Sequence, residues 1–113
     1  MEITFRHERY LFSPSQIWRP ATDIYESPDE VVIIVELAGM REEDINVTLD
    51  ENRLKIWGRR VEPTLSSPVR FHRMEIDRGD FERELVITTP IKQVDVTATY
   101  RQGLLLIKLP KVS

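Results

Sequence analysis

The sequence predicts an all-β protein, folded as a sandwich of antiparallel strands. After the first 22 residues, short segments alternate apolar and polar residues, turn-forming residues separate these segments, and a hairpin pattern closes the chain. In that hairpin, residues 94–100 alternate, a turn follows with Gly103 in a position that tolerates positive φ, and an apolar run at 104–109 stops at Pro110. The alternation indicates strands that bury one face in a shared core.

The strands expected before this hairpin follow the same reasoning. Residues 31–35 are a β-branched run, which is typical of a strand covered on both faces. Ser27 and Glu30 match a helix-capping pattern just before this run, but the β-branched residues favour a strand over a helix. Alternation in the fourth strand points Trp57 outward. Strands are expected at 23–26, 31–35, 45–49, 54–58, 80–87, 94–100 and 104–109, with a corner at 38–40 and a polar turn at 41–44.

Residues 59–78 form a connection that is unusually long for a compact domain and contains Pro63 and Pro68. Its second half, residues 69–76, could itself form a strand, although neither face of that strand would be wholly apolar. Such a segment is a poor core strand but a plausible edge strand for another subunit. The sequence therefore predicts a long loop that carries a strand and acts between chains.

Residues 1–20 are expected to form an arm, followed by one domain at 21–111. The arm holds four of the nine aromatic residues without a helix or strand period, and these are Phe5, Tyr10, Phe12 and Trp18. An aromatic segment of this kind packs against the domain body, a partner subunit or a client protein. Packing on its own assembly is the commoner outcome, and client contact is the functional alternative.

Composition narrows the function classes. The chain has 113 residues, no cysteine and a formal charge of −3 with both signs interspersed. This charge balance gives no general attraction to nucleic acid, and the basic cluster that includes Arg59 and Arg73 is expected to be solvated or ion-paired. The start of the chain is too charged for a signal peptide, and the apolar runs are too short to cross a bilayer. We therefore expect a cytoplasmic protein without nucleic-acid or membrane partners.

Catalytic signatures are absent from the sequence. His7 and His72 are the two histidines, and Glu75 stands at a spacing from His72 that would place the two side chains on opposite faces of a strand. Nucleophile-elbow, phosphate-loop and dinucleotide-binding patterns are also missing. The sequence thus predicts no enzyme, no catalytic residue, no metal and no cofactor.

Several motifs fall together in one order. They are residues 23–26 (Asp-Ile-Tyr-Glu), 35–39 (Val-Glu-Leu-Ala-Gly), 43–45 (Glu-Asp-Ile), Leu54-x-Ile56-x-Gly58-Arg59, Gly79-x-Phe81-x-Arg83, Ala98-x-x-x-Gln102-Gly103-Leu104-Leu105 and the closing Leu-Pro-Lys at 109–111. In this order and spacing, the chain resembles the bacterial-type small heat-shock proteins and their α-crystallin domain. The resemblance covers about Trp18 to Lys111. It implies an immunoglobulin-like sandwich and an ATP-independent holdase chaperone that binds partly unfolded proteins.

The resemblance also implies where the chain meets its partners. In a homodimer or small oligomer, the strand in the long loop would pair with the 23–26 strand of a second subunit, and Arg83 would make ion pairs near that contact, with Glu75 or Asp77 as candidate acids. The dimer-interface candidates are Asp23, Ile24, Tyr25, Glu26, Phe71, His72, Arg73, Met74, Glu75 and Arg83. A groove for clients or for a family-type tail would be lined by Ile45, Val47, Leu49, Val94, Val96 and Ala98, unless these residues simply face the sandwich core.

The sequence departs from the family pattern at its end. Family members usually continue past the Pro-Lys pair with an Ile-x-Ile/Val tail, whereas Val112 and Ser113 follow Lys111 here. A dimer or small assembly is therefore expected rather than a large tail-locked oligomer. The alternative from another class is a non-chaperone adaptor, a co-chaperone-like sandwich that docks one folded partner. Such modules generally lack the long strand-bearing loop.

Overall fold

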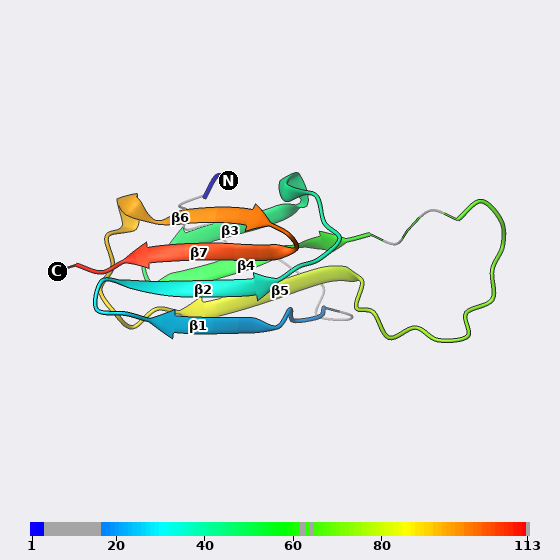
Figure 1. The fold of residues 1–113 in the computed structure, drawn as a ribbon, viewed down its shortest axis with the longest axis horizontal. Helices are drawn as coiled ribbons and strands as arrows, with labels where there is room; N and C mark the ends of the chain where they lie inside the picture. Colours follow the sequence, from blue (N-terminus) through cyan, green and yellow to red (C-terminus); the bar gives the residue numbers. More distant parts are fainter. Residues whose placement is uncertain (4–16, 62, 64, 113) are drawn as a thin grey trace.

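The computed structural model describes residues 1–3, 17–61, 63 and 65–112 of the chain. Within these residues, seven strands and two single-turn 3-10 helices follow one another along the sequence (Figure 1). In order they are β1 (Thr22–Glu26), β2 (Glu30–Glu36), η1 (Glu42–Asp44), β3 (Ile45–Asp50), β4 (Arg53–Arg60), β5 (Gly79–Val86), η2 (Gln93–Asp95), β6 (Thr97–Arg101) and β7 (Leu104–Pro110).

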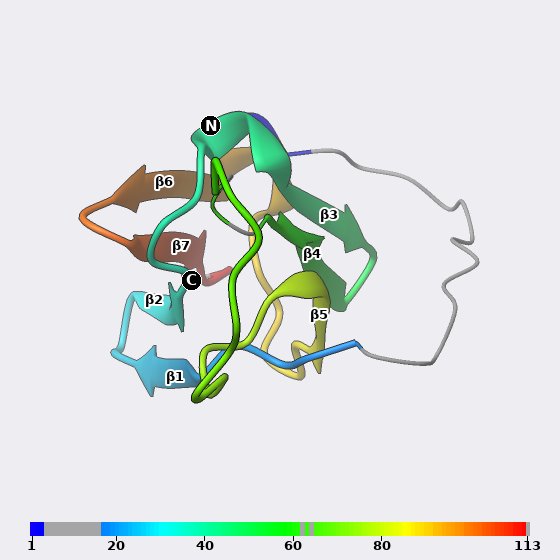
Figure 2. The ribbon, with the colours of Figure 1, turned by 90° about the vertical axis from the view of Figure 1, so that its right-hand side faces the viewer.

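The strands form two antiparallel sheets that pack face to face (Figure 2). One sheet has the order β1-β2-β7-β6, and the other has the order β3-β4-β5. β2 pairs with β7 along its whole length, from Glu30 opposite Pro110 to Glu36 opposite Leu104. The pairing of strands so distant in sequence confirms the predicted all-β antiparallel sandwich.

The core lies between the two sheets and is built from the inward half of each alternating strand. Val31, Ile33 and Val35 of β2 are buried while their neighbours are only partly covered, so this strand alternates instead of being covered on both faces as expected. The central residues of β4 and β7 alternate in the same way. The fully buried side chains include Ile33, Leu37, Leu49, Leu54, Ile56, Phe81, Leu105, Ile107 and Leu109.

The hairpin between β6 and β7 turns through two residues with positive φ. Gln102 has φ of 53° and Gly103 has φ of 79°. Positive φ at both central positions is the backbone geometry that matches the right-handed twist of the flanking strands. The turn predicted from this glycine is therefore present, and it brings β6 beside β7 with Ala98 opposite Ile107.

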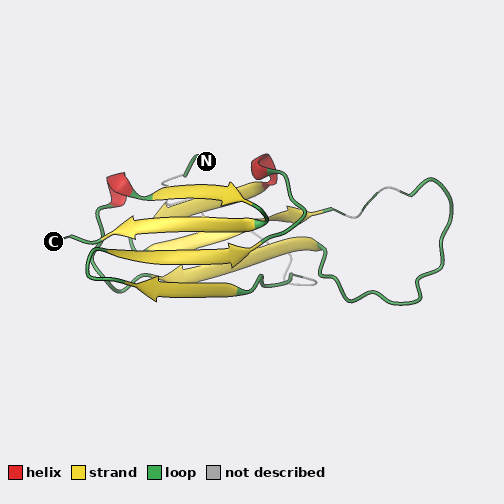
Figure 3. Ribbon diagram, in the orientation of Figure 1, coloured by secondary structure: helices red, strands yellow, loops and turns green. Residues whose placement is uncertain are grey.

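The strand predicted at 94–100 starts later than its alternation suggested. Residues 93–95 form η2, and β6 begins only at Thr97. Val94 consequently lies outside the sheet with 92% of its surface exposed. Val94 fits the alternation of the strand, but it lies in the 3-10 turn η2, which is part of the connection between β5 and β6. Figure 3 shows the two 3-10 turns at opposite ends of the sandwich.

The strand predicted within the long loop is absent from the single chain. Residues 61–78 contain no strand in their described part, and the loop runs out beyond the end of the sandwich (Figure 1). A strand needs a partner for its backbone N–H and C=O groups, and the loop has no neighbouring strand in its own chain at this distance from the sheets. The molecule extends 57 Å along its longest axis, and the loop lies at one end of that axis (Figure 1).

Candidate interaction surface

β1 is an edge strand with little of its own surface buried. It pairs with β2 alone, and Asp23, Ile24, Tyr25 and Glu26 are all exposed. Ile24 and Tyr25 keep more than half of their surface in contact with solvent. An edge strand offers unpaired backbone groups to another strand, and apolar residues on both of its faces would be covered by such an addition. β1 therefore has the properties of an acceptor for a further strand.

The long loop carries a second exposed apolar surface. Phe71 and Met74 are more than half exposed, and Leu65 and Ile76 are similar. Together with charged neighbours they line a shallow hollow of about 330 Å³, formed by Pro63, Leu65, Phe71, Arg73, Met74, Glu75, Ile76 and Arg78. Isolated exposed apolar residues are ordinary, but a contiguous group on a projecting loop marks an interaction site.

The structure does not bring the predicted dimer residues together within one chain. β1 lies along the sandwich, whereas residues 71–75 lie on the loop beyond its end (Figure 1). All five loop candidates are exposed, and Arg73 pairs with Glu75 at 3.7 Å. The two segments could therefore meet only between two copies, and the single chain leaves that prediction open.

Arg83 lies on β5 and is partly buried. It borders a hollow together with Ile17, Arg19, Glu82 and Glu84. Among the described residues it forms no ion pair with the expected acids: Glu75 pairs with Arg73, and Asp77 accepts hydrogen bonds through its backbone carbonyl from Arg60. Within one chain, Arg83 therefore does not pair with Glu75 or Asp77.

Glu26 at the end of β1 is tied to the end of β7. Its carboxylate accepts a hydrogen bond from Lys111 Nζ at 2.7 Å. The hydrogen bond and charge of Lys111 hold the pKa of Glu26 below its ordinary value. This contact spans β2 and anchors one end of the exposed edge strand, which sequence reasoning had not connected to Lys111.

The six residues predicted to line a groove divide into two groups. Ile45, Val47, Leu49, Val96 and Ala98 are buried in the core. Their burial agrees with the alternative stated above, in which the inward faces of β3 and β6 complete the sandwich core. Val94 is exposed but belongs to η2. A groove for clients or for a tail at this edge stays a prediction.

The described beginning of the chain lies at that edge. Met1 and Ile3 are partly buried and pack against the core. Figures 1 and 2 both place the N-terminus on the side of the sandwich where β3 and β6 are the outermost strands. Of the predicted arm contacts, Phe5, Tyr10 and Phe12 lie outside the described residues. Trp18 is described and packs on Phe81, with ring centroids 5.3 Å apart.

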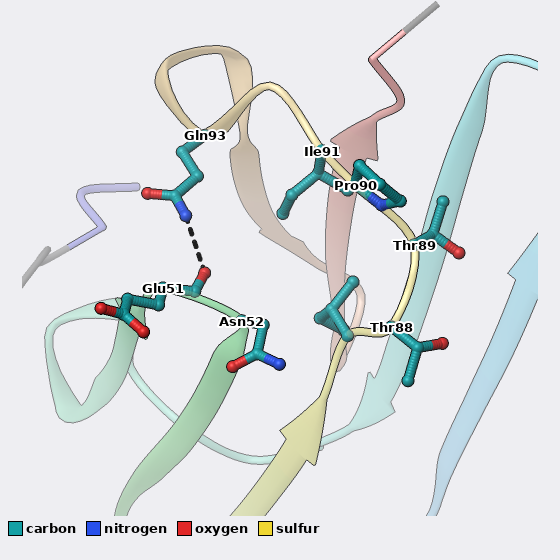
Figure 4. A pocket seen from close by; sticks show the side chains of 8 residues that line it. Glu51, Asn52, Thr88, Thr89, Pro90, Ile91 and Gln93 are labelled. Carbon is teal, nitrogen blue, oxygen red and sulfur yellow. Dashed lines mark hydrogen bonds between the residues drawn. The ribbon is translucent and has the colours of Figure 1, made fainter.

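A hollow of about 430 Å³ opens at the end of the sandwich opposite the loop (Figure 4). Its lining comes from the β3–β4 turn and the segment after β5, and Gln93 Nε2 donates to the Glu51 carbonyl at 2.8 Å. Glu51 supplies the one carboxylate of this lining. The described residues contain no cluster of three potential metal ligands, and no helix among them could cross a membrane.

The structure is thus a β-sandwich with an exposed sheet edge at β1 and a projecting loop that carries exposed apolar residues. Residues 23–113 match the model of the Hsp20/alpha crystallin family, and the chain belongs to this family. Members of the family are chaperones that act without ATP and are not enzymes. The family assignment suggested by the sequence motifs is thereby confirmed.

Known proteins agree with this assignment. Small heat shock protein C4 of Rickettsia felis is 33% identical over 97 residues, which cover 86% of this chain and 60% of that protein. The small heat-shock protein structure from Xylella fastidiosa matches with a TM-score of 0.77 and 32% identity, covering 88% of this chain and 90% of the other. Heat shock protein 16.0 from Schizosaccharomyces pombe matches with a TM-score of 0.75 and 31% identity, covering 85% and 89%.

Proposed function

We propose that this protein is an ATP-independent holdase that works in the cytoplasm and binds partly unfolded proteins before they aggregate. The observation that carries the proposal is the loop at 61–78, which holds six of the twelve large apolar residues exposed in the described part of the chain. A domain that only needed to fold would bury or remove such residues. Their display on a projecting segment is suited to binding another chain.

The loop and β1 are the two halves of the dimer contact in this proposal. Residues 71–75 of each copy add as a strand to the outer edge of β1 in the other copy. The added strand would satisfy the backbone groups of that edge and cover Ile24 or Tyr25, depending on the face. Because the contact is the same in both directions, two copies complete it and form a two-fold pair.

Clients present the same chemistry that the dimer contact uses. An unfolded chain exposes apolar side chains and unpaired backbone groups, and a sheet edge with apolar neighbours can accept both. No nucleotide is required because binding uses surface that is already exposed. Client capture in this proposal therefore depends on how much of β1 and the loop is free at a given moment.

Light scattering of a heat-denatured model client tests the proposal. We expect this protein, without nucleotide, to suppress aggregation near equimolar ratios. A variant in which Phe71, Met74 and Ile76 are replaced by serine should lose most of the suppression while keeping its β-sheet circular dichroism. Wild-type protein that suppresses no client aggregation at several-fold excess would refute the holdase and favour an adaptor that docks a folded partner.

A further inference from the structure

The long loop leaves the sandwich at Arg60 and returns at Gly79, and Arg60 joins these two points. Its Nε donates to the Asp77 carbonyl at 3.0 Å, and its Nη2 donates to the same oxygen at 2.6 Å. Its Nη1 donates to the Ala38 carbonyl at 3.1 Å. One guanidinium thus links the outgoing end of the loop, the returning end of the loop and the corner after β2.

A second residue completes this cluster from the segment before β1. The ring of Trp18 lies under the Arg60 guanidinium, with Cζ 4.4 Å from the ring centroid. The indole N–H of Trp18 donates to the Gly79 carbonyl at 3.2 Å. The backbone of Trp18 also bonds to β5, donating to the Asp80 carbonyl and accepting from the Glu82 N–H, each at 3.1 Å.

Three properties of the cluster distinguish it from ordinary surface contacts. The Arg60 side chain makes three hydrogen bonds at once, to two different segments of the chain, although these bonds face solvent. The acceptors of these hydrogen bonds are backbone carbonyls. The contact therefore holds the course of the main chain at the base of the loop, and not merely the position of another side chain. The planar guanidinium can serve two carbonyls and a ring face at once, which an ammonium cannot do.

We propose that Trp18 and Arg60 are positioning residues that hold the base of the 61–78 loop in the direction required for strand exchange with a second copy. This inference rests on the proposed dimer contact. A loop of this length has many conformations, and fixing its two ends to one another reduces the number that must be lost when residues 71–75 pair with β1 of the partner. The cluster also links the segment that leads into β1 to the donor loop of the same chain, so both halves of the exchange are placed by one contact.

The test compares Arg60→Lys and Trp18→Phe with Arg59→Lys as the matched control. Arg59 is the neighbouring arginine on β4, and it makes an exposed ion pair with Asp80 at 3.3 Å. Dimer dissociation constants are measured by sedimentation velocity over a dilution series, and urea unfolding is measured in parallel at a concentration where each variant is monomeric.

We expect Arg60→Lys and Trp18→Phe each to raise the dissociation constant about tenfold, the ratio that 1.4 kcal/mol of binding free energy produces. Arg59→Lys should change it less than about threefold by the same scale. The double variant should be no weaker than about the weaker single variant, because both changes disrupt one contact. Monomer unfolding should shift far less than dimerisation.

The failures are distinguishable. A wild-type dimer whose affinity is unchanged in both variants would overturn the positioning role and leave the proposed exchange intact. Equal losses in Arg59→Lys and Arg60→Lys would also overturn it, since charge near the loop would then be the cause. A dimer of wild-type affinity in a variant whose residues 65–76 are replaced by a glycine-serine linker of equal length would refute the proposed exchange itself, and the positioning role with it.

Discussion

Replacement of Phe71 by alanine tests the proposed exchange most directly. Phe71 lies on the loop with 63% of its surface exposed. Complete burial of a phenylalanine side chain stabilises by about 1.5–3 kcal/mol. Burial of the exposed part of Phe71 in a dimer should therefore contribute about 1–2 kcal/mol of binding free energy in each copy.

A two-fold contact contains this residue twice, so the loss in Phe71→Ala amounts to about 2–4 kcal/mol per dimer. At 1.4 kcal/mol for each tenfold change, the dissociation constant should rise about 30- to 700-fold. The stability of the single sandwich should be almost unchanged, because Phe71 is not part of its core. Loop-ordering entropy is common to both proteins and cancels in the comparison.

Sedimentation equilibrium of wild type and variant over matched concentrations gives both dissociation constants. Val86→Ala is the control: Val86 is 58% exposed at the end of β5 remote from the loop, and its removal should leave dimerisation unchanged. Phe71→Leu should fall between wild type and alanine. A rise of less than threefold in Phe71→Ala would show that this side chain is not buried between copies and would refute the reasoning.

Three further predictions concern the sandwich. Gly58→Ala should destabilise the fold by about 1–3 kcal/mol in urea unfolding, because its Cβ would collide with the Asp44 carbonyl oxygen; an unchanged midpoint would contradict this. Gly103→Ala should cost about 1–2 kcal/mol by the same assay, since it forces alanine into left-handed backbone, and a neutral effect would exclude strain at the hairpin. Lys111→Met should raise the pKa of Glu26 toward 4.5 in an NMR titration. Because Lys111 lowers the pKa of Glu26, the stabilising effect of the contact is present above pH 4.5 and is lost as the pH falls through the lowered value. An identical Glu26 titration in the wild type and in Lys111→Met would reject the contact.

The sequence predicted those elements whose pattern is set by burial on one face. β7 and β4 were expected within two residues of their observed bounds. An apolar run between a glycine turn and Pro110 indicated β7, and alternation indicated β4. The start of β6 was predicted too early because Val94 continues the alternation of β6, although it lies in the connecting turn η2. The alternation of apolar and polar residues alone does not show at which residue the hydrogen bonding between two strands begins.

The candidate site was predictable only in part. The length of the connection indicated a loop that acts between chains, whereas the choice of β1 as its partner strand came from the family resemblance. The contacts of Arg60 and Lys111 could not be predicted from the sequence. Arg60 binds backbone carbonyls, and Lys111 binds a residue on a strand that is distant in sequence. Trp18 was recognised as an aromatic that must pack on something. Its position on Phe81 requires the three-dimensional course of the segment before β1.

The parallel bridge between Trp18 and Phe81 has a consequence for self-assembly. Each sheet of a sandwich has two borders where a foreign strand can attach, and a molecule that leaves borders open on both sheets can polymerise into fibrils. Here Trp18 occupies part of the β5 border beside the loop, so a strand that adds at this position must displace it. Strand addition at this position of β5 is therefore disfavoured, whereas the border at β1 stays exposed.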